Sequence, residues 1–157
     1  MKNLFFAILL LLSSVAGSAQ TNTTPTQAIR AGKEDTIAIT QTALNYIEGY
    51  YNADPQRMSK AVVSELAKRI IIKDTAGDAI QNLGYSSLLL STRRNKNSNI
   101  FINSESFKAV VTIYDIDDNI ATAKVTANKF KFIDYLHLGR VNGEWKIINV
   151  LWEVIAK

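Results

Sequence analysis

The carboxy-terminal stretch, residues 129–156, constrains the fold of this chain most. Two runs rich in aromatic and β-branched residues flank Asn142-Gly143 in it. An Asn-Gly pair between such runs is a strong signal for a tight type I′ hairpin, because both turn residues must adopt a positive φ. We therefore predict a β-hairpin here that forms the centre of a curved sheet.

The alternation along the two arms of this hairpin predicts which side chains face the interior. The set expected to point inward is Phe130, Phe132, Asp134, Leu136, Leu138, Trp145, Ile147, Asn149 and Leu151. The intervening positions are assigned to the outer face because they include Lys131 and Lys146. On this assignment Asp134 and Asn149 point inward among apolar neighbours, whereas Trp152 points outward.

Residues 1–19 have the three parts of a secretory signal peptide. Lys2 supplies a basic start, residues 4–12 form an apolar run, and Gly17-Ser18-Ala19 is a small-residue cleavage motif. We predict cleavage at the end of this segment, and hence an exported protein, periplasmic or secreted, with a flexible polar leader over residues 20–33. The apolar run is shorter than the roughly 20 residues of a transmembrane helix, so no membrane insertion is expected after cleavage.

The composition excludes several classes of protein. The chain has no cysteine and one histidine, which rules out disulfides and the usual zinc ligand sets, and no cofactor is expected. The formal net charge of +4 falls to +3 once Lys2 is removed with the signal peptide, leaving 17 basic against 14 acidic residues. This charge is too small to indicate a nucleic-acid partner.

The remaining elements are predicted from apolar spacing. Residues 35–51 show helical spacing and predict a long amphipathic helix, and Asp54-Pro55 cap and open a second, short helix. Residues 70–72 predict a short strand. Residues 79–92 predict a third helix, although Gly84 allows a later start.

Two further alternating runs, residues 108–116 and 119–127, predict a hairpin before the final one, and a brief edge pairing is expected at residues 100–102. Helices followed by a meandering sheet predict a single α+β domain over residues 34–157, with the helices on one face of a mostly antiparallel sheet.

Three stretches resemble one known family: residues 37–54, Glu65-Leu66-Ala67-Lys68-Arg69 and residues 134–152. They are similar to the putative lumazine-binding family of the nuclear-transport-factor-2-like superfamily, which also holds SnoaL-like and ketosteroid-isomerase-like proteins. The resemblance implies a cone-shaped domain, three helices packed on a strongly curved sheet with a pocket between them, and frequent homodimers. Family members often carry His-Pro just before the second stretch, where this chain has Val63-Ser64, so any pocket chemistry of that histidine is absent here.

Asp134 is the first candidate for chemistry. A carboxylate buried among apolar side chains has a raised pKa unless a donor compensates, and it can then act as a general base. Tyr46 or Tyr50 would serve as an oxyanion donor, and the resemblance to ketosteroid-isomerase-like proteins implies such a pairing of acid and tyrosine. Alternatively, backbone groups or a Lys or Arg of a neighbouring strand hold Asp134, or it faces solvent.

We expect a pocket for a small aromatic heterocycle or another apolar ligand. Its predicted walls are Tyr46, Tyr50, Phe132, Asp134, Trp145 and Asn149. Trp145 is expected to stack on the ligand and Asn149 to hydrogen-bond it, although both can equally complete the core. Tyr135, His137 and Trp152 are assigned to the outer face as a homodimer interface.

Three functions remain open on this sequence. The favoured one is an exported domain that binds a small ligand or a partner and has no catalytic set. The second is a small isomerase, cyclase or dehydratase with Asp134 as general base. The third is a dimeric assembly module without a small ligand.

Overall fold

A computed structural model describes residues 32–95, 107–129 and 132–155 of the chain. Its elements are, in order, α1 (Lys33–Tyr51), α2 (Pro55–Ala61), β1 (Val62–Ile72), β2 (Ala79–Gly84), α3 (Tyr85–Asn95), β3 (Ala109–Asp117), β4 (Ile120–Ala127), β5 (Phe132–Val141) and β6 (Glu144–Val154). The α+β class and the two predicted hairpins, β3–β4 and β5–β6, are confirmed. The predicted signal peptide, most of the leader and the edge pairing at residues 100–102 lie outside the described residues.

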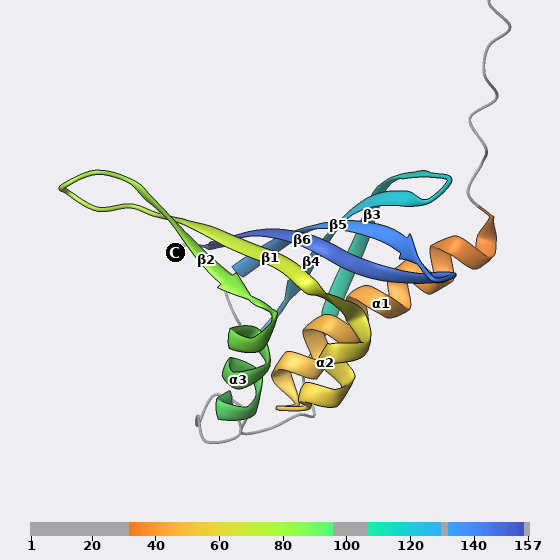
Figure 1. The fold of residues 1–157 in the computed structure, drawn as a ribbon, viewed down its shortest axis with the longest axis horizontal. Coiled ribbons are helices and arrows are strands. Elements are labelled where there is room, and N and C mark those ends of the chain that lie inside the picture. The colour runs from red at the N-terminus through yellow and green to blue at the C-terminus, as the bar shows by residue number, and fades with distance from the viewer. Residues whose placement is uncertain (1–31, 96–106, 130–131, 156–157) are drawn as a thin grey trace, which may run out of the picture.

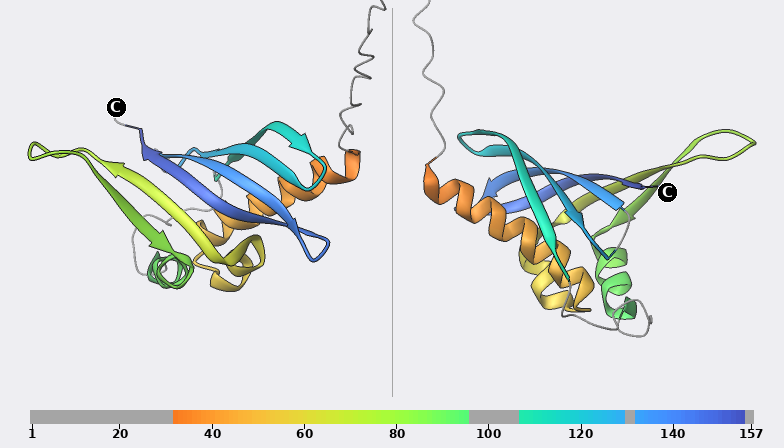
Figure 2. Two further views of the ribbon diagram at one scale, coloured as in Figure 1. Left: turned by 45° about the horizontal axis from the view of Figure 1, so that its top comes forward. Right: turned by 180° about the vertical axis from the view of Figure 1, so that it is seen from behind.

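The strands form one six-stranded sheet in the order β2-β1-β6-β5-β4-β3. All neighbours are antiparallel except β1 and β6, which run parallel. The three helices lie on the same side of the sheet, as Figures 1 and 2 show. Because β1 lies beside β6, the strand that follows the first two helices is placed next to the last strand of the domain. In the described ranges, no helix is both long and apolar enough to span a bilayer.

Helix α1 packs on the sheet through one apolar stripe. Ile39, Ala43 and Ile47 are fully buried and belong to one core cluster with Leu136 and Ile147 of the sheet. The spacing of four residues along α1 puts the three side chains on one face of the helix. Burial of this face anchors α1 across the sheet and positions Tyr46 and Tyr50, in the last turns of the helix, at the site described below.

Two local features stabilise the start of α2 and allow it to pack against α1. The side chain of Asp54 accepts hydrogen bonds from the backbone N–H groups of Gln56 and Arg57, as expected of an N-cap residue followed by proline. At Gly49 a Cβ atom would lie 2.8 Å from the backbone nitrogen of Met58, so the close approach of the two helices requires glycine at that position.

The β5–β6 turn has the predicted conformation. Asn142 has a φ of 51° and Gly143 a φ of 82°. Two successive positive φ angles are those of a type I′ turn, which matches the right-handed twist of the flanking strands.

The predicted facing of β6 is wrong beyond Ile147, because the strand contains a β-bulge. Leu138 pairs with Ile147 but His137 pairs with Asn149, which leaves Ile148 as an extra residue in β6. One extra residue reverses the alternation of every side chain after it. Val150 and Trp152 therefore point inward, and Asn149 and Leu151 point to the outer face.

The predicted third helix does not begin at residue 79, and its later start agrees with the alternative that Gly84 allows. Residues 79–84 form the edge strand β2, and α3 begins at Tyr85. Ile80 is 66% exposed and pairs with Ile71 of β1. The β-branched residues at the end of β1 favour a strand partner, and this pairing outweighs the local helical spacing.

Candidate functional site

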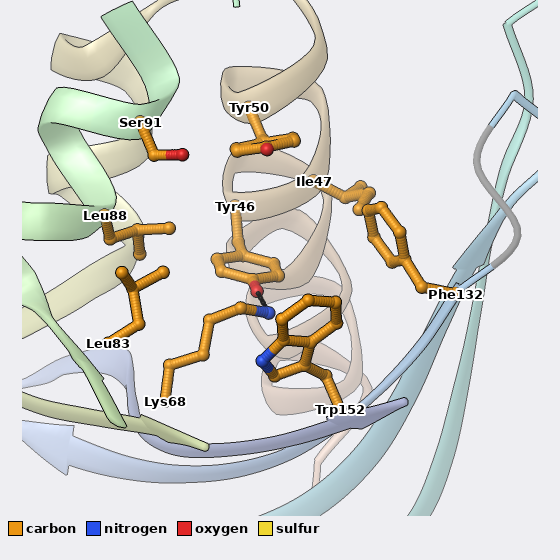
Figure 3. Close-up of a pocket in the computed structure, with 9 residues that line it drawn as sticks. All are labelled: Tyr46, Ile47, Tyr50, Lys68, Leu83, Leu88, Ser91, Phe132 and Trp152. Carbon is orange, nitrogen blue, oxygen red and sulfur yellow. Dashed lines mark hydrogen bonds between the residues drawn. The ribbon is translucent and has the colours of Figure 1, made fainter. Parts of the chain in front are cut away.

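A pocket with aromatic walls lies between helices α1 and α3 and the neighbouring ends of the strands. Its volume is about 120 Å³. Nine residues line it: Tyr46, Ile47 and Tyr50 of α1, Lys68 of β1, Leu83 of β2, Leu88 and Ser91 of α3, Phe132 of β5 and Trp152 of β6 (Figure 3). Apolar and aromatic walls with a few convergent polar groups are typical of small-molecule sites.

Three polar side chains meet at one side of this pocket. The ammonium group of Lys68 donates a hydrogen bond to the Tyr46 hydroxyl oxygen over 2.7 Å and forms an ion pair with Asp134 Oδ1. The Tyr46 hydroxyl in turn donates to the same Oδ1 over 2.9 Å. We call Tyr46, Lys68 and Asp134 the polar triad. Figure 3 shows the Lys68 ammonium group against the Tyr46 hydroxyl, beside the Trp152 ring.

The polar triad is almost completely removed from solvent. The side chain of Lys68 is 8% exposed and that of Asp134 is 0% exposed. Burial lowers the pKa of Lys68, and the negative charge of Asp134 opposes this shift. Burial and then the Asp134 charge raise the pKa of Tyr46 well above its ordinary value of 10.0, so its hydroxyl keeps its proton as a donor.

Tyr46 predicts a pH dependence of stability. Between its ordinary and its raised pKa the folded state holds a proton that the unfolded state has lost. The stabilising contribution is therefore present below about pH 10 and is lost as the pH rises above it. We expect the free energy of unfolding, from urea denaturation at about pH 9 to 11, to fall more steeply for the wild type than for Tyr46→Phe.

Lys68 has the opposite effect on how stability changes with pH. Its pKa is lowered in the folded state, so the unfolded state binds more protons and stability rises with pH. The Tyr46→Phe variant keeps Lys68, so the difference in slope between the two proteins reports mainly on Tyr46. Equal slopes would mean that the Tyr46 hydroxyl ionises as it does in water.

Two buried polar atoms of the site have no hydrogen-bond partner among the described residues: Trp152 Nε1 and Asp134 Oδ2. The Lys68 ammonium group also lies 4.6 Å from the centre of the Trp152 ring, a cation–π contact. A buried polar atom without a partner costs about 1–3 kcal/mol, and such atoms in a native structure often mark a place for water or a ligand. The indole N–H is therefore a buried donor on a residue that lines the pocket.

The structure brings together four of the six residues predicted for the pocket. Tyr46, Tyr50 and Phe132 line it, and Asp134 points inward as expected and lies behind Lys68 and Tyr46. Of the alternatives given for Asp134, the observed contacts agree best with a basic side chain of another strand as its partner. Lys68 supplies that side chain from β1, which is separated from β5 by β6.

The other two predicted residues lie elsewhere. Trp145 is buried at the opposite end of α1, where its Nε1 donates to Asp35 Oδ1 over 3.0 Å and the Arg140 guanidinium group lies over its ring. Asn149 is on the outer face and lines a separate hollow together with His137. The expectation that Asn149 points into the helix-covered pocket is wrong, because the bulge at Ile148 intervenes.

Six of the nine lining residues are not in the predicted set, and Lys68 and Trp152 are the two that matter most for the chemistry. The sequence places Lys68 only in a stretch that resembles the family, although Leu66, Lys68 and Ile70 alternate along β1 and are all buried. This alternation is the signal that could have placed Lys68 opposite an inward Asp134. Trp152 was assigned to the outer face by the same error that placed Asn149 inward.

The outer face carries two of the three residues predicted for an interface. Tyr135 is 46% exposed, and its ring stacks on that of Tyr114 of β3 with the centroids 6.2 Å apart. His137 is exposed on the same face. Trp152 is not part of this surface, because it lines the pocket.

Comparison with known proteins agrees with this architecture. A structure of an NTF2-like protein of unknown function from Shewanella baltica OS155 has a TM-score of 0.65 at 23% identity, covering 79% of this chain and 96% of that one. A second NTF2-like protein of unknown function, from Methylobacillus flagellatus KT, has a TM-score of 0.65 at 22% identity, covering 82% and 98%. A protein described as a putative scytalone dehydratase from Novosphingobium aromaticivorans has a TM-score of 0.54 at 10% identity, covering 78% and 85%.

These identities are low, and the likeness of the three structures shows the fold alone. No curated protein sequence matches the chain significantly. The sequence model of the family described as "Putative lumazine-binding" matches residues 34–153, which is nearly the whole of the domain. The chain therefore belongs to the putative lumazine-binding family, within the NTF2-like fold.

Proposed function

We propose that this domain binds one small, ring-shaped and largely apolar ligand in the pocket between α1, α3 and the sheet. The observation that carries the proposal is the combination of aromatic walls with a wholly buried polar triad and an indole N–H that has no partner among the described residues. Apolar walls supply affinity, and the few polar groups supply orientation. The family description, putative lumazine-binding, also suggests a small ligand.

The size of the pocket limits what can enter it. A closed apolar cavity of about 150 Å³ holds a benzene molecule, whereas drug-sized ligands occupy roughly 300–1,000 Å³. The pocket of about 120 Å³ is close to the first value. We therefore expect it to hold a single ring, or one ring of a larger heterocycle whose remainder extends through the mouth.

The geometry supports ligand binding better than proton abstraction by Asp134. Its Oδ1 already accepts from Lys68 and Tyr46, and the residue is not among those that line the pocket. A general base must come within about 3 Å of the proton that it removes, directly or through one water. Lys68, not Asp134, is the charged member of the polar triad that lines the pocket, where it can donate a hydrogen bond to a ligand.

Proton and nitrogen NMR of the two indole N–H groups tests this proposal. We expect a subset of single-ring aromatic compounds to shift the Trp152 Nε1–H signal and to leave that of Trp145 unchanged, because Trp145 lies at the opposite end of α1 and its N–H is bonded to Asp35. Leu83→Trp places a bulky side chain at a partly buried position of the pocket wall and should abolish the shift. Unchanged Trp152 signals throughout, or equal shifts in Leu83→Trp, would contradict the proposal.

We further propose that two copies associate through the outer face. Tyr114, Tyr135 and Leu151 are about half exposed there, and Tyr135 lies directly beside Leu151 in the β5–β6 pairing. Adjacent exposed aromatic and aliphatic side chains are typical of an interface.

Light scattering after size exclusion should give twice the 17.4 kDa chain mass, less any processed segment, and Tyr135→Glu should give the monomer. Ile80→Glu is the matched control, because Ile80 is exposed on the edge strand and should leave the dimer intact. A monomeric wild type would refute this interface.

Export is a separate proposal that rests on residues 1–19 alone. Their basic start, apolar run and small-residue motif are those of a secretory signal peptide. Amino-terminal sequencing of the protein from its native host should begin after Ala19.

A further inference from the structure

The hydrogen-bonding groups that line the pocket differ in what they can offer a ligand. Lys68 and Trp152 carry only donors, and the remaining polar side chains of the wall are the hydroxyls of Tyr46, Tyr50 and Ser91. The Tyr46 hydroxyl donates its hydrogen to Asp134 and accepts from Lys68. The Lys68 ammonium and the Trp152 indole, which are in cation–π contact, are therefore both donors.

Both of these donors have capacity left. Lys68 has three N–H bonds, and its oxygen partners among the described residues are Tyr46 Oη and Asp134 Oδ1. Trp152 Nε1 has no partner there at all. Figure 3 shows the indole nitrogen on the edge of its ring that lies nearer to Lys68 and Leu83 than to Phe132. A ligand acceptor atom at this place would satisfy groups that the protein leaves unsatisfied.

The charge balance decides which kind of acceptor fits. The positive charge of Lys68 is already compensated by Asp134, and no other cationic side chain is among the described residues that line the pocket. A ligand carboxylate would thus bring an uncompensated negative charge into a buried site, which is costly. A ligand amine would meet two donors, and the carboxylate that could accept from it lies behind them.

We propose that the pocket selects a neutral, planar ring compound whose carbonyl oxygen accepts hydrogen bonds from Lys68 Nζ and Trp152 Nε1. This inference rests on the proposed binding function and specifies the ligand class for the same site. It distinguishes neutral ketones, amides and ring lactams from the corresponding acids, amines and hydrocarbons.

Three compounds of nearly equal shape test the proposal on the wild-type protein. Acetophenone is neutral and has a carbonyl oxygen, α-methylstyrene replaces that oxygen by a CH₂ group, and benzoate carries a negative charge. Affinities are measured by titration of the Trp152 Nε1–H signal, with that of Trp145 as the internal control. We expect acetophenone to bind about tenfold or more tightly than either of the others, and to move the Trp152 proton downfield as a hydrogen bond forms.

A triple variant separates the effect of the hydrogen-bond donors on ligand preference from the effect of the pocket's shape. In Tyr46→Phe/Lys68→Met/Asp134→Leu, apolar side chains of similar size replace the polar triad, so that no charge is left buried without a partner. We expect the preference for acetophenone over α-methylstyrene to fall by about tenfold in this triple variant.

Each outcome is decisive. Equal wild-type affinities for acetophenone and α-methylstyrene would overturn the carbonyl proposal and leave the binding function intact. Tighter binding of benzoate would overturn it in favour of an anion site. If none of the three compounds moves the Trp152 signal, the binding function and the carbonyl proposal are both refuted for single-ring ligands. An undiminished preference in the triple variant would also overturn the assignment of Lys68 as donor.

Discussion

Lys68→Met is expected to destabilise the folded domain by about 3–5 kcal/mol, because it leaves the Asp134 carboxylate buried without its cation. Asp134 is 0% exposed, so its carboxylate is shielded from bulk water and depends on Lys68 for a counter-charge. The remaining hydrogen bond from Tyr46 cannot compensate a full charge. The free energy of unfolding from urea denaturation, compared at neutral pH, gives the measurement.

The triple variant Tyr46→Phe/Lys68→Met/Asp134→Leu is the matched control for this prediction. Replacing all members of a buried polar group by apolar residues of similar volume is often neutral or stabilising. We expect it to unfold within about 2 kcal/mol of the wild type, and therefore to be more stable than the single variant Lys68→Met. A triple variant less stable than Lys68→Met would show that the polar triad contributes more to stability than the desolvation of its charges costs.

Deletion of Ile148 is expected to cost much less than Lys68→Met, because it removes only the extra residue of the bulge. Without this residue β6 alternates regularly with Ile147 inward, Asn149 outward, and Val150 and Trp152 inward, as in the wild type. Burial of a large apolar side chain contributes about 1.5–3 kcal/mol, and because Val150 and Trp152 both stay buried the deletion should cost less than the loss of either of them. Denaturation followed by near-ultraviolet circular dichroism reports both the stability and the environment of Trp152.

Ile148→Ala keeps the bulge and is the control for the deletion. The side chain of Ile148 is 36% exposed, so its truncation should cost less than about 1 kcal/mol. If the deletion exposed Trp152 while Ile148→Ala did not, Ile148 would not be the extra residue that sets which side chains of β6 face the pocket.

The site could be predicted in part because alternation along one strand is a local property. Asp134 stands between Phe132 and Leu136, and the alternation in β5 placed it inward correctly. The bulge in β6 could not be seen in the same way. Ile147 and Ile148 are both apolar, so either can occupy the inward position, and only pairing with β5 decides which does.

The contacts of Asp134 depend on the order of the strands, which no local pattern contains. Lys68 reaches Asp134 because β1 lies parallel to β6, although the two residues are far apart in the chain. The same is true of β2, whose helical spacing is overridden by pairing with β1. The fold was predictable from the turn signals and the apolar spacing, whereas the identity of the partner of Asp134 required the assembled sheet.

A crystal structure of the protein grown with acetophenone tests the central claim most directly. We expect one ring in the pocket between Leu88 and Trp152, with the ligand oxygen within hydrogen-bond distance of Lys68 Nζ. A structure in which side chains fill the pocket, with Lys68 and Trp152 closed upon each other and the compound bound elsewhere or not at all, would contradict it.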